Sequence, residues 1–231
     1  MSSSGHTLPR FQNRGESVSR LEGFSDAVFG FAITLLVVSL AVPTQFDELL
    51  QQLRGLPVFA LTFASIATIW HSQYVFFRRY GLNDNLTIVL NLALLFVVLF
   101  YVYPLKFLFG LALGANGVTI REAQVPELFL IYAAGFAAVN VLLAVLDLHA
   151  YRLRDQLALS NWERFVTRVS IADNAAVIAV CVLSAGLAQV VPEPYTSPVA
   201  GFVYFLVAVI KFGAGRIRGR RARALARSTS G

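Results

Sequence analysis

The segment RLEGFSDAVFGFAITLLVVSL, residues 20–40, decides how this chain is organised. Its second half is mostly apolar and carries no charge, whereas its first turns contain Glu22, Ser25 and Asp26. A helix needs about 20 predominantly apolar residues to cross a bilayer, and a carboxylate inside such a helix is costly unless it has a partner. The segment therefore predicts a membrane-spanning helix with a carboxylate that has a specific partner or task.

The composition of the whole chain is that of an integral membrane protein. Of its 231 residues, 57% are hydrophobic and only 14% are charged, whereas about a quarter of the residues in soluble domains are charged. A single cysteine, Cys181, excludes a disulfide framework within one chain. Six apolar segments approach the length of a membrane span, at residues 24–42, 57–77, 85–110, 127–149, 167–190 and 196–213. We therefore expect an all-α membrane protein with six transmembrane helices.

Basic residues mark alternate connections between these segments. The amino-terminal arm, the 78–84 loop, the 150–168 loop and the carboxyl-terminal tail are rich in arginine, whereas acidic residues outnumber arginine in the other loops. By the positive-inside rule both termini are cytoplasmic. We expect residues 1–18 to be a disordered cytoplasmic arm, residues 19–213 to form the six-helix transmembrane domain, and residues 214–231 to be a basic cytoplasmic tail, with the protein in the cell inner (cytoplasmic) membrane.

The net charge of +6 does not indicate a nucleic-acid-binding protein, because no stacking aromatics alternate with the basic residues. The basic tail is better placed to contact the anionic headgroups of membrane lipids. Three scattered histidines and one cysteine do not make a metal site. No nucleophile elbow and no pair of catalytic acids appears either. We therefore expect no enzymatic activity, no metal and no cofactor.

The start of the first span contains a helix signal. Ser19 to Glu22 fit the capping box S-x-x-E, which places the helix start at Ser19. Asp26 then lies roughly 10 Å into the helix. Other spans place polar side chains at about the same depth, namely Trp70, His71, Asn91, Asp173 and Asn174. Lipid cannot satisfy such groups, so they should face one another or water.

Two interpretations of Asp26 follow from this polar layer. In the first, Asp26 binds an ion or carries a proton. In the second, Asp26 accepts hydrogen bonds from Trp70, His71 or Asn91 and so ties three helices together. We favour the second interpretation, because Asp26 points away from the apolar stripe of its own helix.

That stripe consists of residues recurring at helical spacing, with a hydroxyl beside them, namely Phe24, Phe31, Leu35, Val38 and Val42, with Thr34. An apolar stripe on a membrane helix usually packs against neighbours or lipid. The sequence contains no carbonyl filter of the T-V-G-Y-G kind and no arginine-rich voltage sensor. If this protein is a channel, its constriction must come from side chains.

The pattern R-x-x-x-F-S-D, formed by Arg20, Phe24, Ser25 and Asp26, is followed by A-V-F-G-F-A-I-T-L-L-V. It resembles the signature of the transmembrane protein 175 family, the lysosomal potassium channel family with its prokaryotic homologues. Further matching features are Trp70-His71 late in the second span, Asn91-Leu92 early in the third, and Pro104 near the end of the third. One six-span unit resembles the prokaryotic form, and the motifs lie mainly in the first three spans.

The resemblance implies a homotetramer whose first helices surround a central pore for K+. On the family pattern the narrow hydrophobic layers fall on Phe31, Leu35 and Val38, and the pore threonine falls on Thr34. The motif polar residues would hold the pore helix against its neighbours. Phe31 departs from the family pattern, which usually has Ile or Leu there, so four phenylalanines would narrow or reshape the first layer.

The leading hypothesis is therefore a potassium-permeable cation channel with a hydrophobic constriction in its first helix. The alternative is a proton-coupled secondary transporter that uses Asp26, His71 and Asp173 as a relay. A structural or assembly protein without transport activity is a third possibility. No internal repeat or helix broken at mid-membrane, which are frequent in transporters, supports the second hypothesis.

Overall fold

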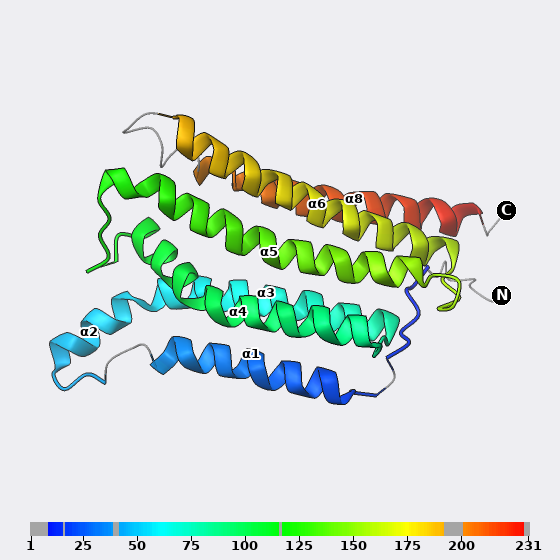
Figure 1. Ribbon diagram of the computed structural model, residues 1–231, viewed down its shortest axis with the longest axis horizontal. Coiled ribbons are helices and arrows are strands. Elements are labelled where there is room, and N and C mark those ends of the chain that lie inside the picture. Colours follow the sequence, from blue (N-terminus) through cyan, green and yellow to red (C-terminus); the bar gives the residue numbers. More distant parts are fainter. Residues whose placement is uncertain (1–8, 16, 39–41, 116, 192–200, 229–231) are drawn as a thin grey trace, which may run out of the picture.

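The structure, a computed structural model, describes residues 9–15, 17–38, 42–115, 117–191 and 201–228. This part of the chain is a bundle of helices running roughly alongside one another (Figure 1), and the expected all-α fold is confirmed for it. The elements are α1 (Arg20–Val38), α2 (Phe46–Arg54), α3 (Leu56–Tyr80), α4 (Asn85–Ala112), the 3-10 helix η1 (Glu122–Gln124), α5 (Val125–Arg152), α6 (Asn161–Val190) and α8 (Phe205–Ser228).

Several of these helices can cross a membrane. Four of them, α1, α4, α5 and α6, are long and apolar enough, and α2 with α3 passes the same test as a pair bent by 45°. The chain is therefore a multi-pass membrane protein. The sixth expected span, residues 196–213, lies partly outside the described residues, and the part that is described includes the start of α8. Residues 39–41, at the end of the first expected span, also lie outside them.

Local sequence signals explain where the helices begin. The capping box predicted at Ser19 is confirmed: its backbone N–H donates to the carboxylate of Glu22 (2.8 Å), and the N–H of Glu22 donates to the Ser19 hydroxyl (3.2 Å). Ser160 and Glu163 form a second capping box at the start of α6. Each pair satisfies backbone donors that a helix start otherwise leaves without partners.

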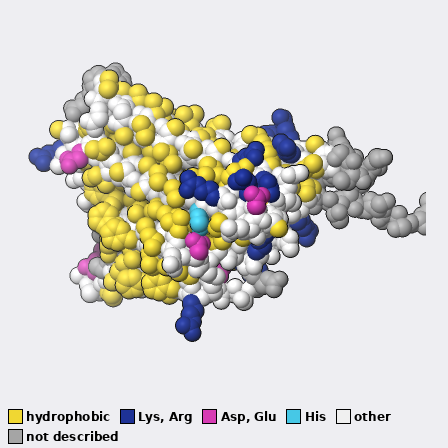
Figure 2. Space-filling model, turned by 45° about the vertical axis from the view of Figure 1, so that its right-hand side comes forward, with side chains coloured by type: hydrophobic (Ala, Val, Ile, Leu, Met, Phe, Trp, Pro, Cys, Tyr) yellow, Lys and Arg dark blue, Asp and Glu magenta, His cyan; other side chains and the backbone are white. Residues whose placement is uncertain are grey.

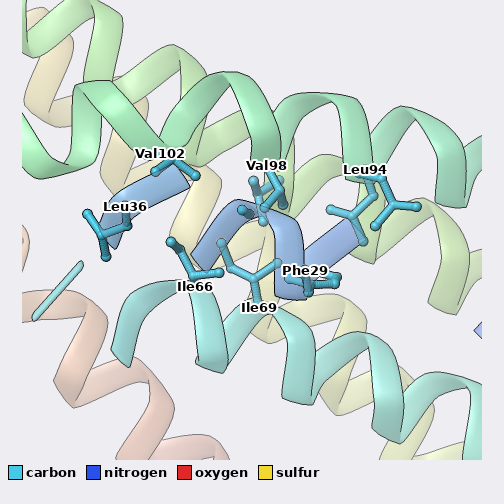
Figure 3. Packing of buried hydrophobic residues seen from close by; sticks show 10 residues of the cluster. Phe29, Leu36, Ile66, Ile69, Leu94, Val98 and Val102 are labelled. Carbon is cyan, nitrogen blue, oxygen red and sulfur yellow. The ribbon is translucent and has the colours of Figure 1, made fainter. Parts of the chain in front are cut away.

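The helices are arranged in sequence across the bundle, with α1 on one side, α3 and α4 beside it, then α5, and α6 with α8 on the other side (Figure 1). Among the described helices, α1 contacts only α3 and α4. The largest core cluster lies at this contact (Figure 3) and includes Phe29, Ala32, Leu36, Ile66, Ile69, Leu94, Val98 and Val102. The remainder of the α1 surface faces away from the bundle.

Residues 9–15 belong to the arm that was expected to be disordered, yet they pack against one end of the bundle. The backbone N–H groups of Arg14 and Gly15 donate to the carbonyl of Arg78 at the end of α3 (3.1 and 3.3 Å). The Arg14 guanidinium forms an ion pair with Glu163 (3.0 Å) and donates to the carbonyl of Leu157 (2.9 Å). One arginine thus satisfies a buried carboxylate and a loop carbonyl, which its position in a polar stretch of sequence did not reveal.

Most of the segment expected as a basic tail, residues 214–231, is helical, because α8 continues to Ser228. The surface of the bundle separates apolar from basic regions. Figure 2 shows hydrophobic side chains over much of one face and Lys and Arg side chains gathered toward one end. That distribution is expected of a protein whose apolar middle lies in the hydrocarbon core of a membrane and whose basic end lies near the lipid headgroups.

Candidate functional site

The first helix has two faces of different character. Its buried residues Ser25, Phe29, Ala32 and Leu36 follow one another at intervals of four, three and four positions, which is the spacing of one helix face. This face fills the contact with α3 and α4 (Figure 3). The other face of α1 has no partner among the described residues of this chain.

The residues predicted to line a pore lie mainly on that second face. Phe31 is 57% exposed and Val38 is 71% exposed. Thr34 is exposed as well, whereas Leu35 is only half-buried at the edge of the face. Two turns before Phe31, Phe24 shares this face and is 52% exposed.

The hydroxyl of Thr34 has a defined orientation. It donates to the carbonyl of Gly30 one turn earlier, over 2.9 Å. Because the proton is used within the helix, the hydroxyl oxygen keeps its lone pairs for an external partner. An oxygen presented in this way suits a cation better than an anion.

A buried hydrogen-bonded triad connects α1 to its two neighbours. The side-chain amide of Asn91 on α4 donates to the hydroxyl of Ser25 on α1 (2.8 Å), and the amide of Gln73 on α3 donates to Asn91 Oδ1. All three side chains are at most 2% exposed. The Ser25 hydroxyl in turn donates to the carbonyl of Leu21 (2.7 Å). Buried polar groups that are paired in this way specify one arrangement of three helices.

Asp26, next to Ser25, has a different environment. It is exposed, and its Oδ1 atom accepts a hydrogen bond from the indole N–H of Trp70 on α3 (2.7 Å). A small cavity of about 130 Å3 beside it is also lined by Glu22, Tyr74 and Arg78. Asp26 therefore joins α1 to α3 at the edge of the exposed face.

Not every residue of the predicted polar network takes part in it. His71 stacks on Tyr74, with ring centroids 6.3 Å apart, and lines a different cavity. Arg20 is exposed, and Phe24 lies on the exposed face of α1 rather than at a helix contact. No described residue lies within 4 Å of where a Cβ would stand on Gly30, so no described helix of the same chain packs closely against α1 at that glycine.

Gln73 is the member of the triad that sequence reasoning missed. It lies three positions after Trp70, so both side chains point to the same side of α3. The sequence signal for this role was a polar residue, Gln73, three positions after Trp70 inside an apolar span. Counting residues along α3 gives the depth of Gln73, whereas its contact with Asn91 depends on its direction around the helix axis.

The expected polar layer is thus divided between two places. Asp173 on α6 forms an ion pair with Lys211 on α8 (2.7 Å). It lines a cavity with His71 and Asn174, and Asp26 is not among the residues lining that cavity. The three residues of the alternative proton relay are therefore not assembled into one site. Among the described residues, no group of three or more histidine, cysteine or acidic side chains is placed to hold a metal ion.

Comparison with known proteins gives consistent results. The family described as endosomal/lysosomal potassium channel TMEM175 matches residues 20–101. A protein of Marivirga tractuosa named potassium channel is 37% identical over 232 residues, which cover 94% of each chain. A protein of Chamaesiphon minutus, also named potassium channel, is 31% identical over 139 residues, covering 57% of this chain and 64% of its own.

One solved structure is similar over almost its full length. It is the crystal structure of a variant of the potassium channel MtTMEM175 in complex with a nanobody–MBP fusion protein. It superposes with a TM-score of 0.79 and 36% sequence identity, over 93% of this chain and 99% of the other. The helical arrangement described above is therefore one that a potassium channel of known structure also has.

Proposed function

Because this chain belongs to the TMEM175 family of endosomal/lysosomal potassium channels, we propose that it is a potassium-permeable cation channel whose pore is lined by α1. K+ is the permeant ion, and conduction requires no cofactor. The channel is a homotetramer in the cytoplasmic membrane, with six spans per subunit and both termini in the cytoplasm.

The observation that carries the proposal is the uneven burial of α1. One face of the helix is fully packed against α3 and α4, and the opposite face leaves Phe31, Thr34 and Val38 exposed. A helix at the side of its own bundle is free to meet copies of itself around a symmetry axis. In such a ring the same exposed residues of every subunit face the axis.

The chemistry of this face supports ion passage through a hydrophobic constriction. Phe31, Leu35 and Val38 form successive apolar layers, and loss of water between such layers closes a pore without moving the backbone. Thr34 lies between the first layer and the last. Its oxygen, free to accept because its proton is donated to Gly30, coordinates a partly dehydrated K+.

The polar groups near the start of α1 fix the position of the pore helix. The buried triad of Ser25, Gln73 and Asn91 and the bond from Trp70 to Asp26 join it to both neighbours. In this proposal Asp26 positions α1 and does not bind the permeant ion. Its side chain is already engaged with Trp70 and lies beside a small cavity of its own.

The experiment measures K+ flux into liposomes that contain the purified full-length protein, driven by a potassium gradient. Phe31→Ala, Thr34→Ala and Leu35→Ala are expected to change the rate or the K+ over Na+ preference. Val38→Ala is expected to have the same kind of effect. Its matched control is Val182→Ala on α6, because these two valines are 71% and 66% exposed. Likewise Phe205→Ala on α8, where Phe205 is 68% exposed, is the control for Phe31→Ala.

The outcomes separate the hypotheses. Fast flux that responds to the α1 variants and not to the two controls supports the pore. Slow, strictly proton-coupled uptake that Asp26→Asn abolishes would support the carrier instead. Absence of flux for every ion tested would overturn both.

A further inference from the structure

A second polar site lies away from α1. A partly open cavity of about 280 Å3 is lined by residues of α3, α5, α6 and α8. One water molecule occupies about 30 Å3 in the liquid, and pockets for drug-sized ligands begin near 300 Å3, so the cavity suits a small polar group. Its charged lining residues are Arg79, Asp147, Asp173, Lys211 and Arg218. None of them has a role in the proposed pore.

The acidic part of the cavity has an unused acceptor. Asp173 is only 9% exposed; its Oδ2 atom accepts from Lys211, and its Oδ1 atom is buried with no hydrogen-bond partner among the described residues. Asp147 is 8% exposed and accepts from the Ser170 hydroxyl over 2.7 Å. Buried carboxylates are stable when donors surround them. A ligand that brings N–H donors would complete this part of the site.

The basic part has unused donors. Among the described residues, no carboxylate lies within 4 Å of the guanidinium of Arg79 or Arg218. The Arg79 guanidinium lies over the ring of Phe11, 5.0 Å from its centroid. Within the described part of the chain, the one hydrogen bond that the Arg218 side chain donates is from its Nε–H to the carbonyl of Ala214 (3.3 Å). The remaining N–H groups of each guanidinium form a planar fork that fits phosphate oxygens.

The two parts together select a zwitterion. A simple anion would meet two buried carboxylates, and a simple cation would meet three basic side chains. A ligand with an ammonium group and a phosphate group matches both parts at once. The helix α8, which carries Lys211 and Arg218, also has exposed apolar residues, among them Val209 and Phe212, which are 65% and 64% exposed. That surface is suited to acyl chains in a protein that crosses a membrane.

We propose that this cavity binds the headgroup of phosphatidylethanolamine, with the ammonium on Asp147 and Asp173 and the phosphate on Arg79 and Arg218. The lipid then links α3 to the outer helices α6 and α8. This binding is separate from ion conduction and is measured without it.

The test is native mass spectrometry of the full-length protein in detergent with defined lipids. Phosphatidylethanolamine is expected to be retained about tenfold more than phosphatidylcholine, whose quaternary ammonium has no N–H to donate. It is also expected to be retained more than phosphatidylglycerol, which has a phosphate but no cation. Equal retention of the three lipids would overturn the proposal.

Matched variants assign the two halves of the site. Asp147→Asn keeps the size of the side chain and is expected to remove the preference for phosphatidylethanolamine, whereas Asp155→Asn at an exposed loop position is not. Arg218→Gln is expected to weaken retention of phosphatidylethanolamine and phosphatidylglycerol alike, and Arg220→Gln, on the same helix and exposed, is the control. Unchanged retention in both cavity variants would contradict the assignment.

A soluble molecule could carry the same chemistry, and a further arm distinguishes it. O-phosphoethanolamine is added to the delipidated protein. Weak binding compared with the lipid supports a lipid site, in which the acyl chains contribute. Binding as tight as that of the lipid would overturn the assignment to a lipid and identify a soluble zwitterion as the ligand.

Discussion

Trp70 and Asp26 bridge α3 and α1 through one hydrogen bond of 2.7 Å between the indole N–H and the carboxylate. One position further along α3, His71 lines the cavity shared with α5, α6 and α8. Successive residues of a helix point about 100° apart. Two adjacent side chains of α3 therefore serve different contacts, Trp70 with the proposed pore helix and His71 with the cavity that the outer helices line.

Removing this bond should affect stability more than selectivity. Trp70→Phe keeps the aromatic ring that stacks on Tyr74 but loses the donor, and Asp26→Asn weakens the acceptor. We expect each change to cost about 1 kcal/mol of stability, measured as a lower thermal unfolding midpoint and a lower yield of the proposed tetramer. The control is Trp162→Phe on α6. A stable Asp26→Asn protein with an altered K+ over Na+ preference would contradict the positioning role of Asp26.

Asn91→Ala should be more damaging, because it removes the acceptor of the buried Gln73 amide and leaves the buried Ser25 hydroxyl with only its bond to the carbonyl of Leu21. The expected loss is about 2 to 4 kcal/mol, read from thermal or denaturant unfolding in detergent. Asn140→Ala on α5 is the matched control, since the Asn140 amide donates within its own helix, to the carbonyl of Phe136. Equal losses in the two variants would show that the triad adds nothing beyond a local bond.

Gly135 allows α4 and α5 to approach closely. A Cβ at this position would stand 2.4 Å from the ring of Tyr101, which is only 6% exposed. We expect Gly135→Ala to destabilise the protein by about 1 to 3 kcal/mol through overpacking. At Gly186 on α6 a Cβ meets no described atom within 4 Å, so Gly186→Ala should be neutral or stabilising, because alanine favours a helix. Thermal midpoints compare the two, and a loss at Gly186 equal to that at Gly135 would argue against steric crowding.

Asp84 should make stability depend on pH. Burial disfavours its charged form, but hydrogen bonds from Thr87 together with the attraction and hydrogen bond of His149 outweigh it, so the pKa of Asp84 lies below its ordinary 3.8. A carboxyl group with a lowered pKa stabilises the folded state above its unfolded-state pKa, and this contribution is lost as the pH falls through the folded-state value.

Unfolding midpoints of the unmodified protein and of Asp84→Asn test this expectation. The difference in unfolding midpoint between the two proteins should be largest near neutral pH. It should narrow below about pH 4, where the carboxyl of the unmodified protein is increasingly protonated. Asp47→Asn, at an exposed position of α2, should show no such difference. A difference of constant size across the whole range would mean that ionisation of Asp84 is not its cause.

How much of this structure was predictable depends on the kind of signal. Long apolar runs and the capping box at Ser19 are local, and they predicted the start of α1 and the extent of α4 and α5 closely. The short helix α2 was missed, because its leucines are exposed and its length is far below that of a span. Depth along a helix follows from counting residues, whereas direction around the axis depends on neighbours. For that reason Asp26 and Asp173 were placed at one level but belong to different contacts.

Arg14 has a consequence for how the helices of the subunit are joined. Its guanidinium binds Glu163 at the start of α6, and its backbone binds the end of α3, a few residues before α1 begins at Arg20. Arg14 therefore ties the start of α6 to the end of α3 just before the chain enters the helix that we propose lines the pore.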